Sequence, residues 1–266
     1  PIILSLIVIE VIISNLRKLD YYNLSDSLGS LGLIIGNILI NIMTKGLIIV
    51  FYLYLYQFKF FDLSSLGSIW LEALLTLFAI DFIYYWFHRT SHHVRFFWAI
   101  HMNHHSSEEM NFLVSLRQAW FNPLFRVPFF LILPLLGFNP FLTLAVGAAS
   151  TIWAVIQHTK MIGKLGPLEK IFVTPSSHRV HHGINENYMD KNFGNLFIIW
   201  DRIFGTYQAE EERVIFGLKR NIKSSNPFKI TTFTWHEIFT DFSNSIHIKD
   251  KLKSIFGAPE WKPQQF

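Results

Sequence analysis

Histidine is the residue type in this chain whose spacing points most directly to chemistry, because it gathers in three short clusters. The clusters read HRTSH, HMNHH and HRVHH, and they begin at His88, His101 and His178. Imidazole is the commonest side-chain ligand for transition metals in proteins. Together the three motifs hold eight histidines, more than a single zinc ion takes. The clusters therefore predict a dinuclear metal centre.

The spacing within each cluster suits a shared ligand set. Residues three or four positions apart lie on one face of a helix, so each cluster presents its imidazoles to one point in space. The predicted ligands are His88, His92, His101, His104, His105, His178, His181 and His182. His158, in a QHT element after an apolar run, is a ninth candidate. The isolated His93, His236 and His247 are expected to be interfacial or hydrogen-bonded residues instead.

Several other kinds of metal site fit the motifs poorly. The HExxH motif of metalloproteases is missing from the sequence, since Arg89 and Met102 follow the first histidines of two clusters. Haem ligands would be expected inside apolar spans, whereas these histidines lie at their ends. Imidazole ligands by themselves do not distinguish between iron, copper and zinc, because they suit all three metals. Iron is favoured by the chemistry expected beside lipid, the oxidation of an unactivated C–H bond with dioxygen.

The elements that must position the histidines are apolar and long. The chain is 51% hydrophobic and only 16% charged, less charged than soluble domains. Apolar runs at 2–16, 31–56, 69–87, 121–136 and 141–156 approach the length that crosses a bilayer. We therefore predict an all-α, polytopic membrane helical bundle of about four to five spans, organised as one domain over 1–266. Residues 1–157 would be mainly spans, and 158–266 a cytosolic helical cap with the C-terminal region.

Charge distribution predicts the orientation of this bundle. A shared site requires all three clusters on one side of the membrane, and almost all Lys and Arg residues then fall on that side, with Lys59 on the other. The positive-inside rule makes the histidine side cytoplasmic. The basic residues have no nucleic-acid-binding pattern, and a chain without cysteine has no thiolate ligands. Because Pro1 begins within an apolar run, we expect further residues before it.

The order HxxxH, HxxHH, HxxHH resembles the fatty acid hydroxylase/sterol desaturase superfamily of membrane di-iron oxygenases. The resemblance covers about 81–228 and includes DFIYYWFHRTSH, FFWAIHMNHHSSEEMN, LGPLEKIFVTPSSHRVHHGIN and DKNFGNLFIIWDRIFGTYQAE. The HHSSEE, LRQ and QHT elements and the FGL…NPF tail are most similar to the alkylglycerol monooxygenase branch. Relatives often read SHHRVHHG, whereas Ser177 here replaces the first histidine of that pair.

This resemblance implies a cofactor, a reaction and partners. The nine histidines named above would bind two iron ions, which use O2 to hydroxylate the alkyl chain of a membrane lipid. In the alkylglycerol branch, hydroxylation next to the ether oxygen cleaves the ether lipid, with tetrahydrobiopterin as reductant. Glu108 matches an acidic position of that branch, as a ligand, an acceptor for an imidazole N–H, or a proton donor. The supporting residues would be Asn111, Asp190, Asn192, Asn195 and Asp201; an Asp201–Arg202 ion pair is an equal alternative.

Two rival functions remain open from sequence. The first is a sterol or carotenoid hydroxylase or desaturase with the same site, which would receive electrons from an electron-transfer protein. The second is a non-redox membrane metal-binding or transport protein. Transport would need ionisable residues along the spans, and the candidates are few: Lys45, Glu72, Asp81 and Arg126. The C-terminal region, from about Glu211, would either cover the metal site or lie on the anionic cytoplasmic leaflet.

Overall fold

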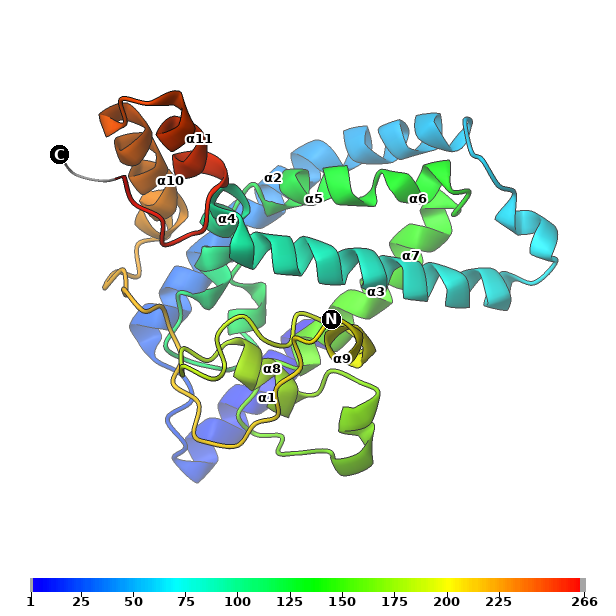
Figure 1. Cartoon of the computed structure of the whole chain (residues 1–266). Coiled ribbons are helices and arrows are strands. Elements are labelled where there is room, and N and C mark those ends of the chain that lie inside the picture. The colour runs from blue at the N-terminus through cyan, green and yellow to red at the C-terminus, as the bar shows by residue number, and fades with distance from the viewer. Residues whose placement is uncertain (1, 264–266) are drawn as a thin grey trace.

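The computed structural model describes residues 2–263 (Figure 1). Within this range the protein is all-α, as predicted, and its only β-type pairings are two isolated bridges. The two longest helices are α2 (Leu24–Tyr56) and α3 (Ile69–His93). They extend side by side with α5, α6 and α7 away from a more irregular region that contains the histidines. The long helices thus form an arm with the predicted metal site at its base.

Local sequence explains where the helices of the arm begin. Side-chain oxygens of Asn23 and Ser68 accept hydrogen bonds from backbone N–H groups in the first turns of α2 and α3. Asn139 does the same for α7 (Pro140–Ile156), whose first residue is a proline. Such caps satisfy N–H groups that have no partner within a helix. The predicted spans at 31–56, 69–87 and 141–156 lie within these three helices.

The predicted span at 121–136 is interrupted. It consists of α5 (Asn122–Phe130) and the single turn α6 (Ile132–Leu135). Proline lacks a backbone N–H and clashes with the preceding turn, so Pro128 and Pro134 weaken the continuous hydrogen-bond ladder. Gly137 then turns the chain at φ +94°, and a Cβ there would lie 2.1 Å from the carbonyl oxygen of Phe61. This contact ties the α6–α7 turn to the loop between α2 and α3.

Two helices, α2 and α3, are long and apolar enough to cross a bilayer; Asn122–Leu135 and Pro140–Ile156 are apolar but shorter. The first helix, α1 (Ile2–Arg17), lies differently from the arm. Its central Glu10 is buried against Thr159 and the backbone of Phe112, near the histidine clusters. The middle of α1 therefore lies beside the base of the arm, and the number of spans stays a prediction.

The base consists of short elements. Helix α4 (Arg95–His105) follows α3 after one extended residue, and η2 (Val114–Leu116) leads into α5. Residues 158–226, here called the cap, contain three short helices: the 3-10 helix η3 (Gly166–Lys170) and the α-helices α8 (Pro175–His181) and α9 (Ile199–Ile203). The cap is therefore mostly loop, less helical than predicted. A hairpin of α10 (Pro227–Asn244) and α11 (Ile248–Phe256) packs against α4.

Candidate metal centre

The structure brings nine histidines together in two neighbouring groups. One group contains His88, His92, His101, His105 and His181; the other contains His104, His158, His178 and His182. Within each group, one nitrogen of every imidazole lies within 4.8 Å of the corresponding nitrogens of the others. These are the nine residues singled out from sequence, and they come from the ends of α3 and α7 and from α4 and α8. The arrangement is that of two adjacent sites for metal ions.

The break between α3 and α4 creates the first group. Val94 is extended (φ −114°, ψ 117°), so the chain turns sharply between two helices that both carry histidines. This turn brings Nε2 of His88 within 2.9 Å of Nε2 of His101. Nε2 of His105 is 3.0 Å from that of His101, and Nε2 of His181 is 3.2 Å from that of His105. Ring nitrogens from three segments therefore converge on one point.

The second group is assembled around His158. Its Nε2 lies 3.0 Å from Nε2 of His104 and 2.9 Å from Nε2 of His178. His182 completes the group, with Nε2 3.2 Å from that of His178. His158 lies two residues after the end of α7, so the helix that returns along the arm positions this imidazole. The sequence argument for a ninth histidine thus agrees with where the chain places it.

Backbone carbonyls on the outer side orient several of the rings. Nδ1 of His88 is 2.8 Å from the Phe193 carbonyl oxygen, and Nδ1 of His181 is 2.9 Å from that of Lys191. Nδ1 of His158 is 2.7 Å from the carbonyl oxygen of Ala154. A neutral imidazole that donates through Nδ1–H has its lone pair on Nε2. These contacts therefore point lone pairs into the groups, as metal ligation requires.

Burial keeps the imidazoles in the form that binds metal. It holds the pKa of His101, His104 and His105 well below the ordinary value and lowers that of His158 to about 4. The same cause depresses the pKa of every histidine in the third cluster. Neutral imidazole is the ligand form. Nε2 of His92 and Nδ1 of His178 are buried without a protein partner. The donor set thus fits two transition-metal ions such as iron.

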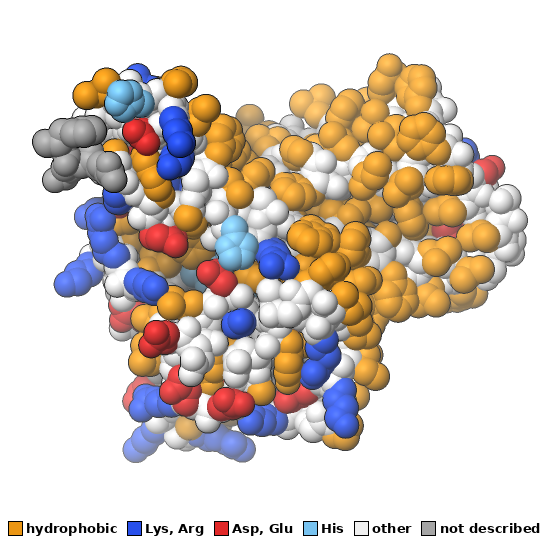
Figure 2. Space-filling model, in the orientation of Figure 1, with side chains coloured by type: hydrophobic (Ala, Val, Ile, Leu, Met, Phe, Trp, Pro, Cys, Tyr) orange, Lys and Arg blue, Asp and Glu red, His pale blue; other side chains and the backbone are white. Residues whose placement is uncertain are grey.

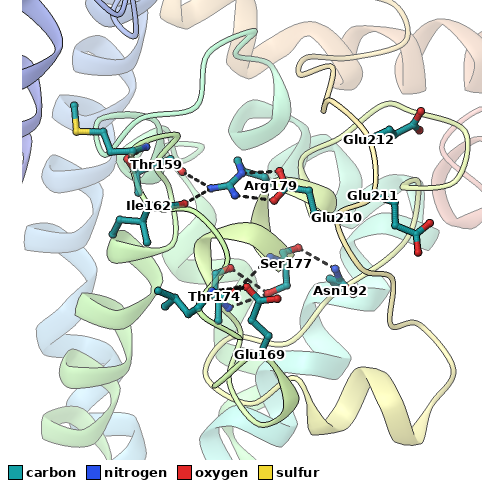
Figure 3. A network of polar contacts seen from close by, with 12 residues as sticks. Thr159, Ile162, Glu169, Thr174, Ser177, Arg179, Asn192, Glu210, Glu211 and Glu212 are labelled. Atoms are coloured by element: carbon teal, nitrogen blue, oxygen red, sulfur yellow. Dashed lines mark hydrogen bonds and ion pairs between the residues drawn. The ribbon is translucent and has the colours of Figure 1, made fainter. Parts of the chain in front are cut away.

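A hydrogen-bond network fixes α8 beside the end of α7 (Figure 3). The buried Arg179 donates to the carbonyl oxygens of Thr159 (3.0 Å) and Ile162 (2.7 Å) and forms a bidentate pair with Glu210 (2.8 and 2.7 Å). Arg179 is adjacent to His178, and Thr159 is adjacent to His158. One guanidinium therefore holds together the two segments that supply most of the second histidine group.

The N-terminus of α8 is closed by the residue that departs from the family pattern. Thr174 and Ser177 form a capping box, in which each side chain bonds the backbone of the other. The Ser177 carbonyl also accepts a hydrogen bond from Asn192 at 2.9 Å. Serine at this position thus stabilises the start of the helix that carries the third cluster.

Two buried carboxylates hold the cap loop that carries the outer carbonyls. Asp201 accepts hydrogen bonds from the N–H groups of Phe193 (2.7 Å) and Gly194 (2.8 Å) and from the Thr206 hydroxyl (2.7 Å). Arg202 is exposed and lies over the Tyr207 ring at 3.8 Å. The expected alternative of an Asp201–Arg202 ion pair is therefore wrong, because the Asp201 carboxylate accepts hydrogen bonds from backbone N–H groups while the Arg202 side chain lies over Tyr207.

Asp81 is the second of these carboxylates, and it projects from the apolar helix α3. It accepts hydrogen bonds from the N–H groups of Leu196 (2.7 Å) and Phe197 (3.0 Å) and from the indole of Trp200 (2.9 Å). A carboxylate in an apolar span requires such partners. Asp81 thus docks the cap on the arm and does not belong to an ion path. Sequence alone identified its position but not this role.

The other acidic and amide residues surround the site at different distances. Asp190 Oδ1 is 3.4 Å from Nδ1 of His92; burial raises the pKa of Asp190, but the hydrogen bond with His92 and the nearby imidazoles of His92, His93 and His181 together lower it. Glu108 is exposed, accepts a hydrogen bond from Asn221 and belongs to neither group found among the described residues. It lines a polar cavity of about 350 Å³ together with Arg117. A direct ligand role for Glu108 is not supported by this location.

The supporting amides bind backbone, and the isolated histidines lie outside the groups. Asn111 donates to the carbonyl oxygen of Tyr21, and Asn195 donates to the carbonyl oxygen of Ser150 at 3.4 Å and to its hydroxyl at 2.6 Å. His93, His236 and His247 are exposed.

Sequence reasoning missed Glu10, whose carboxylate accepts hydrogen bonds from Tyr22 (2.6 Å) and from Thr159. A carboxylate within an otherwise apolar helix was the available signal.

Comparisons with known proteins agree with this geometry. The chain is 34% identical over 270 residues to alkylglycerol monooxygenase from Homo sapiens and 35% identical over 262 residues to that from Xenopus tropicalis. These alignments cover 99% and 97% of this chain but only 59% and 57% of the relatives. An ornithine lipid hydroxylase from Rhizobium tropici is 31% identical over 137 residues, 51% of this chain and 41% of its own.

No solved structure matches the chain. The sequence pattern of the family described as "Fatty acid hydroxylase" matches residues 73–206. That range is half of the chain and contains all nine clustered histidines together with Asp81 and Asp201. The protein therefore belongs to the fatty acid hydroxylase family.

Proposed function

We propose that this protein is an iron-dependent membrane monooxygenase that hydroxylates the alkyl chain of a lipid with O2. Within that class, we propose an ether lipid as substrate, because the relatives are named alkylglycerol monooxygenases, and we propose that hydroxylation next to the ether oxygen leads to its cleavage. The observation that carries the proposal is the pair of adjacent groups of five and four imidazoles, all of them buried except His92 and His101, which are half-buried. Their position at the base of an apolar arm suits a substrate that resides in a bilayer.

In this proposal the nine histidines would hold two iron ions, one in the five-histidine group and one in the four-histidine group. Bound iron would supply the activation of O2 for insertion into a C–H bond. The protein's part is to keep the imidazoles neutral, orient them through the carbonyls of Phe193, Lys191 and Ala154, and exclude bulk water. Arg179 and Asp201 position the site indirectly, because they hold the segments that carry the histidines and the carbonyl groups that orient them.

We propose that the arm crosses the membrane and that the metal centre faces the cytoplasm. Hydrophobic side chains cover the arm, while Lys, Arg, Asp and Glu gather over the cap (Figure 2). Lys59 is at the far end of the arm, where it pairs with Asp62 at 3.1 Å. Lys45 of α2 and Arg126 of α5 also belong to the arm, and most of the other cationic residues lie at the base, the pattern of cytoplasmic segments.

The reductant and the role of Glu108 belong to the same proposal. The similarity to alkylglycerol monooxygenases supports tetrahydrobiopterin as the electron donor, with an electron-transfer protein as the alternative. Glu108 lies outside both imidazole groups and accepts a hydrogen bond from Asn221. Of its three expected roles, this location favours proton donation from the polar cavity.

The rival functions receive less support. A sterol desaturase from Schizosaccharomyces pombe is 26% identical over 178 residues, weaker than the alkylglycerol monooxygenases. For a transporter, the ionisable groups of the spans would have to form a path. Instead Asp81 binds the cap backbone, and the Arg126 guanidinium lies 5.5–5.8 Å from the rings of Tyr84, Phe87 and Phe130.

Product analysis tests the proposal. Protein reconstituted with iron would be supplied with an alkylglycerol, a sterol or a diacyl lipid, each with and without tetrahydrobiopterin. We expect pterin-dependent oxygen uptake and a fatty aldehyde from the alkylglycerol alone, and no product from His181→Ala. Turnover of only the sterol would reject ether-lipid cleavage. Two bound irons without lipid-dependent oxygen uptake would favour a non-redox metal-binding protein.

A further inference from the structure

Helix α11 directs its apolar side away from the protein. Ile248, Leu252 and Phe256 are four residues apart, so they share one helix face. They are 71%, 52% and 58% exposed, whereas Ser254 on the opposite face is completely buried. A surface helix of a soluble protein has the reverse arrangement, with apolar residues inward and polar residues outward. We name the outward row of Ile248, Leu252 and Phe256 the apolar stripe.

Lysines flank the apolar stripe on both sides. By helical geometry Lys251 lies on one edge, and Lys249 and Lys253 lie on the other. Lysine stems cover apolar surface while their ammonium groups reach polar surroundings. A cation on each side of an apolar face is the pattern of helices that lie in the plane of a membrane surface. The charge favours anionic lipid headgroups over zwitterionic ones.

Neighbouring residues extend the exposed apolar surface. Phe239 near the end of α10 is 70% exposed, and Ile246 in the connection to α11 is 80% exposed. The hairpin therefore exposes two further large apolar side chains besides the stripe.

Packing on α2 places the hairpin at the level of the lipid headgroups. Pro227, the first residue of α10, packs on Gly32, where a Cβ would lie only 2.5 Å from the proline ring. A hydrocarbon layer of about 30 Å takes roughly 20 residues of helix. Counted back from Tyr56, that layer begins near Asn37. Gly32 is then about 8 Å outside it, and Figure 1 shows the hairpin on the flank of the bundle near the end of α3.

The orientation of the hairpin is fixed by a buried arginine. Arg95, at the start of α4, pairs with Asp241 of α10 at 2.6 Å and donates to the Ser254 carbonyl at 3.4 Å. Its backbone N–H also donates to the Gly257 carbonyl at 2.9 Å. Both helices are thus attached to the helix that carries the second histidine cluster. The apolar stripe cannot rotate inward without breaking these contacts.

We propose that the α10–α11 hairpin rests on the surface of the bilayer, with the apolar stripe inserted among the lipids and Lys249, Lys251 and Lys253 at anionic headgroups. Of the two expectations for the C-terminal region, this one fits α10–α11. The cap loop of residues 190–194 contacts the imidazoles, while the hairpin packs on the outside of α4. The proposal concerns a lipid surface and does not depend on the reaction that the metal centre performs.

The absence of native cysteine allows a direct test, since a single introduced cysteine is the only labelling site. A nitroxide would be attached at Leu252→Cys in the full chain, reconstituted in vesicles of phosphatidylcholine with or without phosphatidylglycerol. Lys219→Cys, exposed in the cap, is the matched control. We expect the label at 252 to collide with O2 and avoid a water-soluble nickel complex, at a depth of roughly 5–10 Å. The label at 219 should do the opposite.

The charge contribution is tested by changing Lys249, Lys251 and Lys253 to Gln in the Leu252→Cys background. In vesicles with phosphatidylglycerol, we expect the ratio of O2 to nickel collisions to fall roughly twofold or more. Equal collision ratios at positions 252 and 219 would overturn the proposal. Spin–spin broadening between labels at 252 would also overturn it, because a second copy of the chain would then cover the stripe. Ile248→Cys provides a second reporter should Leu252→Cys fail to fold.

Discussion

Replacing Asp201 with alanine should weaken both the cap and the five-histidine group. The carboxylate is completely buried and accepts hydrogen bonds from two backbone N–H groups, those of Phe193 and Gly194. Both residues are buried, so their N–H groups would be left without partners. The carbonyl of Phe193 in turn orients His88. Loss of Asp201 therefore acts on a predicted ligand through one peptide unit.

The size of the effect follows from this geometry. An unsatisfied buried donor costs about 1–3 kcal/mol, so two of them lower the free energy of unfolding by about 2–6 kcal/mol. The Thr206 hydroxyl contributes less, because it retains a contact with the Tyr85 hydroxyl at 3.0 Å. Loss of a partner that orients a ligand typically lowers metal affinity by about 10–100-fold. We expect that decrease in the five-histidine group.

Unfolding followed by tryptophan fluorescence and chelator competition with elemental analysis measure the two effects. Arg202→Ala is the control, because the Arg202 side chain is exposed and has only a stacking contact with Tyr207 and one exposed hydrogen bond, to the Glu169 carbonyl at 3.3 Å. Arg202→Ala should lower the free energy of unfolding by about 1 kcal/mol or less. If both variants lost the same stability, an ion pair between these neighbours would be the better explanation. If Asp201→Ala kept wild-type stability and metal affinity, the reasoning about the cap loop would be refuted.

Three further predictions concern the same site. Removing metal with a chelator should lower the midpoint of thermal unfolding, and adding iron should restore it, since ligand binding stabilises the folded state. An unchanged midpoint would show that metal binding does not stabilise the fold. Burial raises the pKa of Glu210, but the hydrogen bonds and charges around it, those of Arg179 first, outweigh burial and leave the pKa below its ordinary value. This pair should stabilise the protein fully above the ordinary pKa of a glutamate and lose its contribution as pH falls through the lowered pKa; Glu210→Gln should therefore reduce the difference in thermal midpoint between pH 7 and pH 4. His181→Ala should abolish lipid-dependent oxygen uptake, whereas His247→Ala should leave it near wild type; equal activities would refute the assignment of roles.

Much of the site could be predicted because helical spacing is a local property. His88 and His92 are four residues apart on α3, so one face carries both before any tertiary contact forms. His158 was identifiable because a turn at Gly137 returns the apolar chain to the histidine side. Polar residues within apolar runs, such as Asp81, were recognisable as positions that need a partner.

The division into groups of five and four could not be predicted from sequence. His104 and His105 are adjacent, yet they belong to different groups because neighbouring residues on a helix point about 100° apart. Which residue lies opposite each depends on the angle at Val94 and on the cap loop, both of which are tertiary features. The interruption between α5 and α6 and the placement of α1 beside the base also arise from long-range packing, since Glu10 is held by Thr159, 149 residues away.

Counting the metal ions in matched variants tests the two-site arrangement most directly. Iron and zinc per chain would be measured after loading wild-type protein, His158→Ala and His247→Ala and removing loosely bound metal. The arrangement of five and four imidazoles predicts two ions in the wild type and in His247→Ala. His158 lies at the centre of the four-histidine group, so its variant should keep one ion, in the five-histidine group. One ion in the wild type, or two retained in His158→Ala, would contradict a dinuclear centre built from these nine histidines.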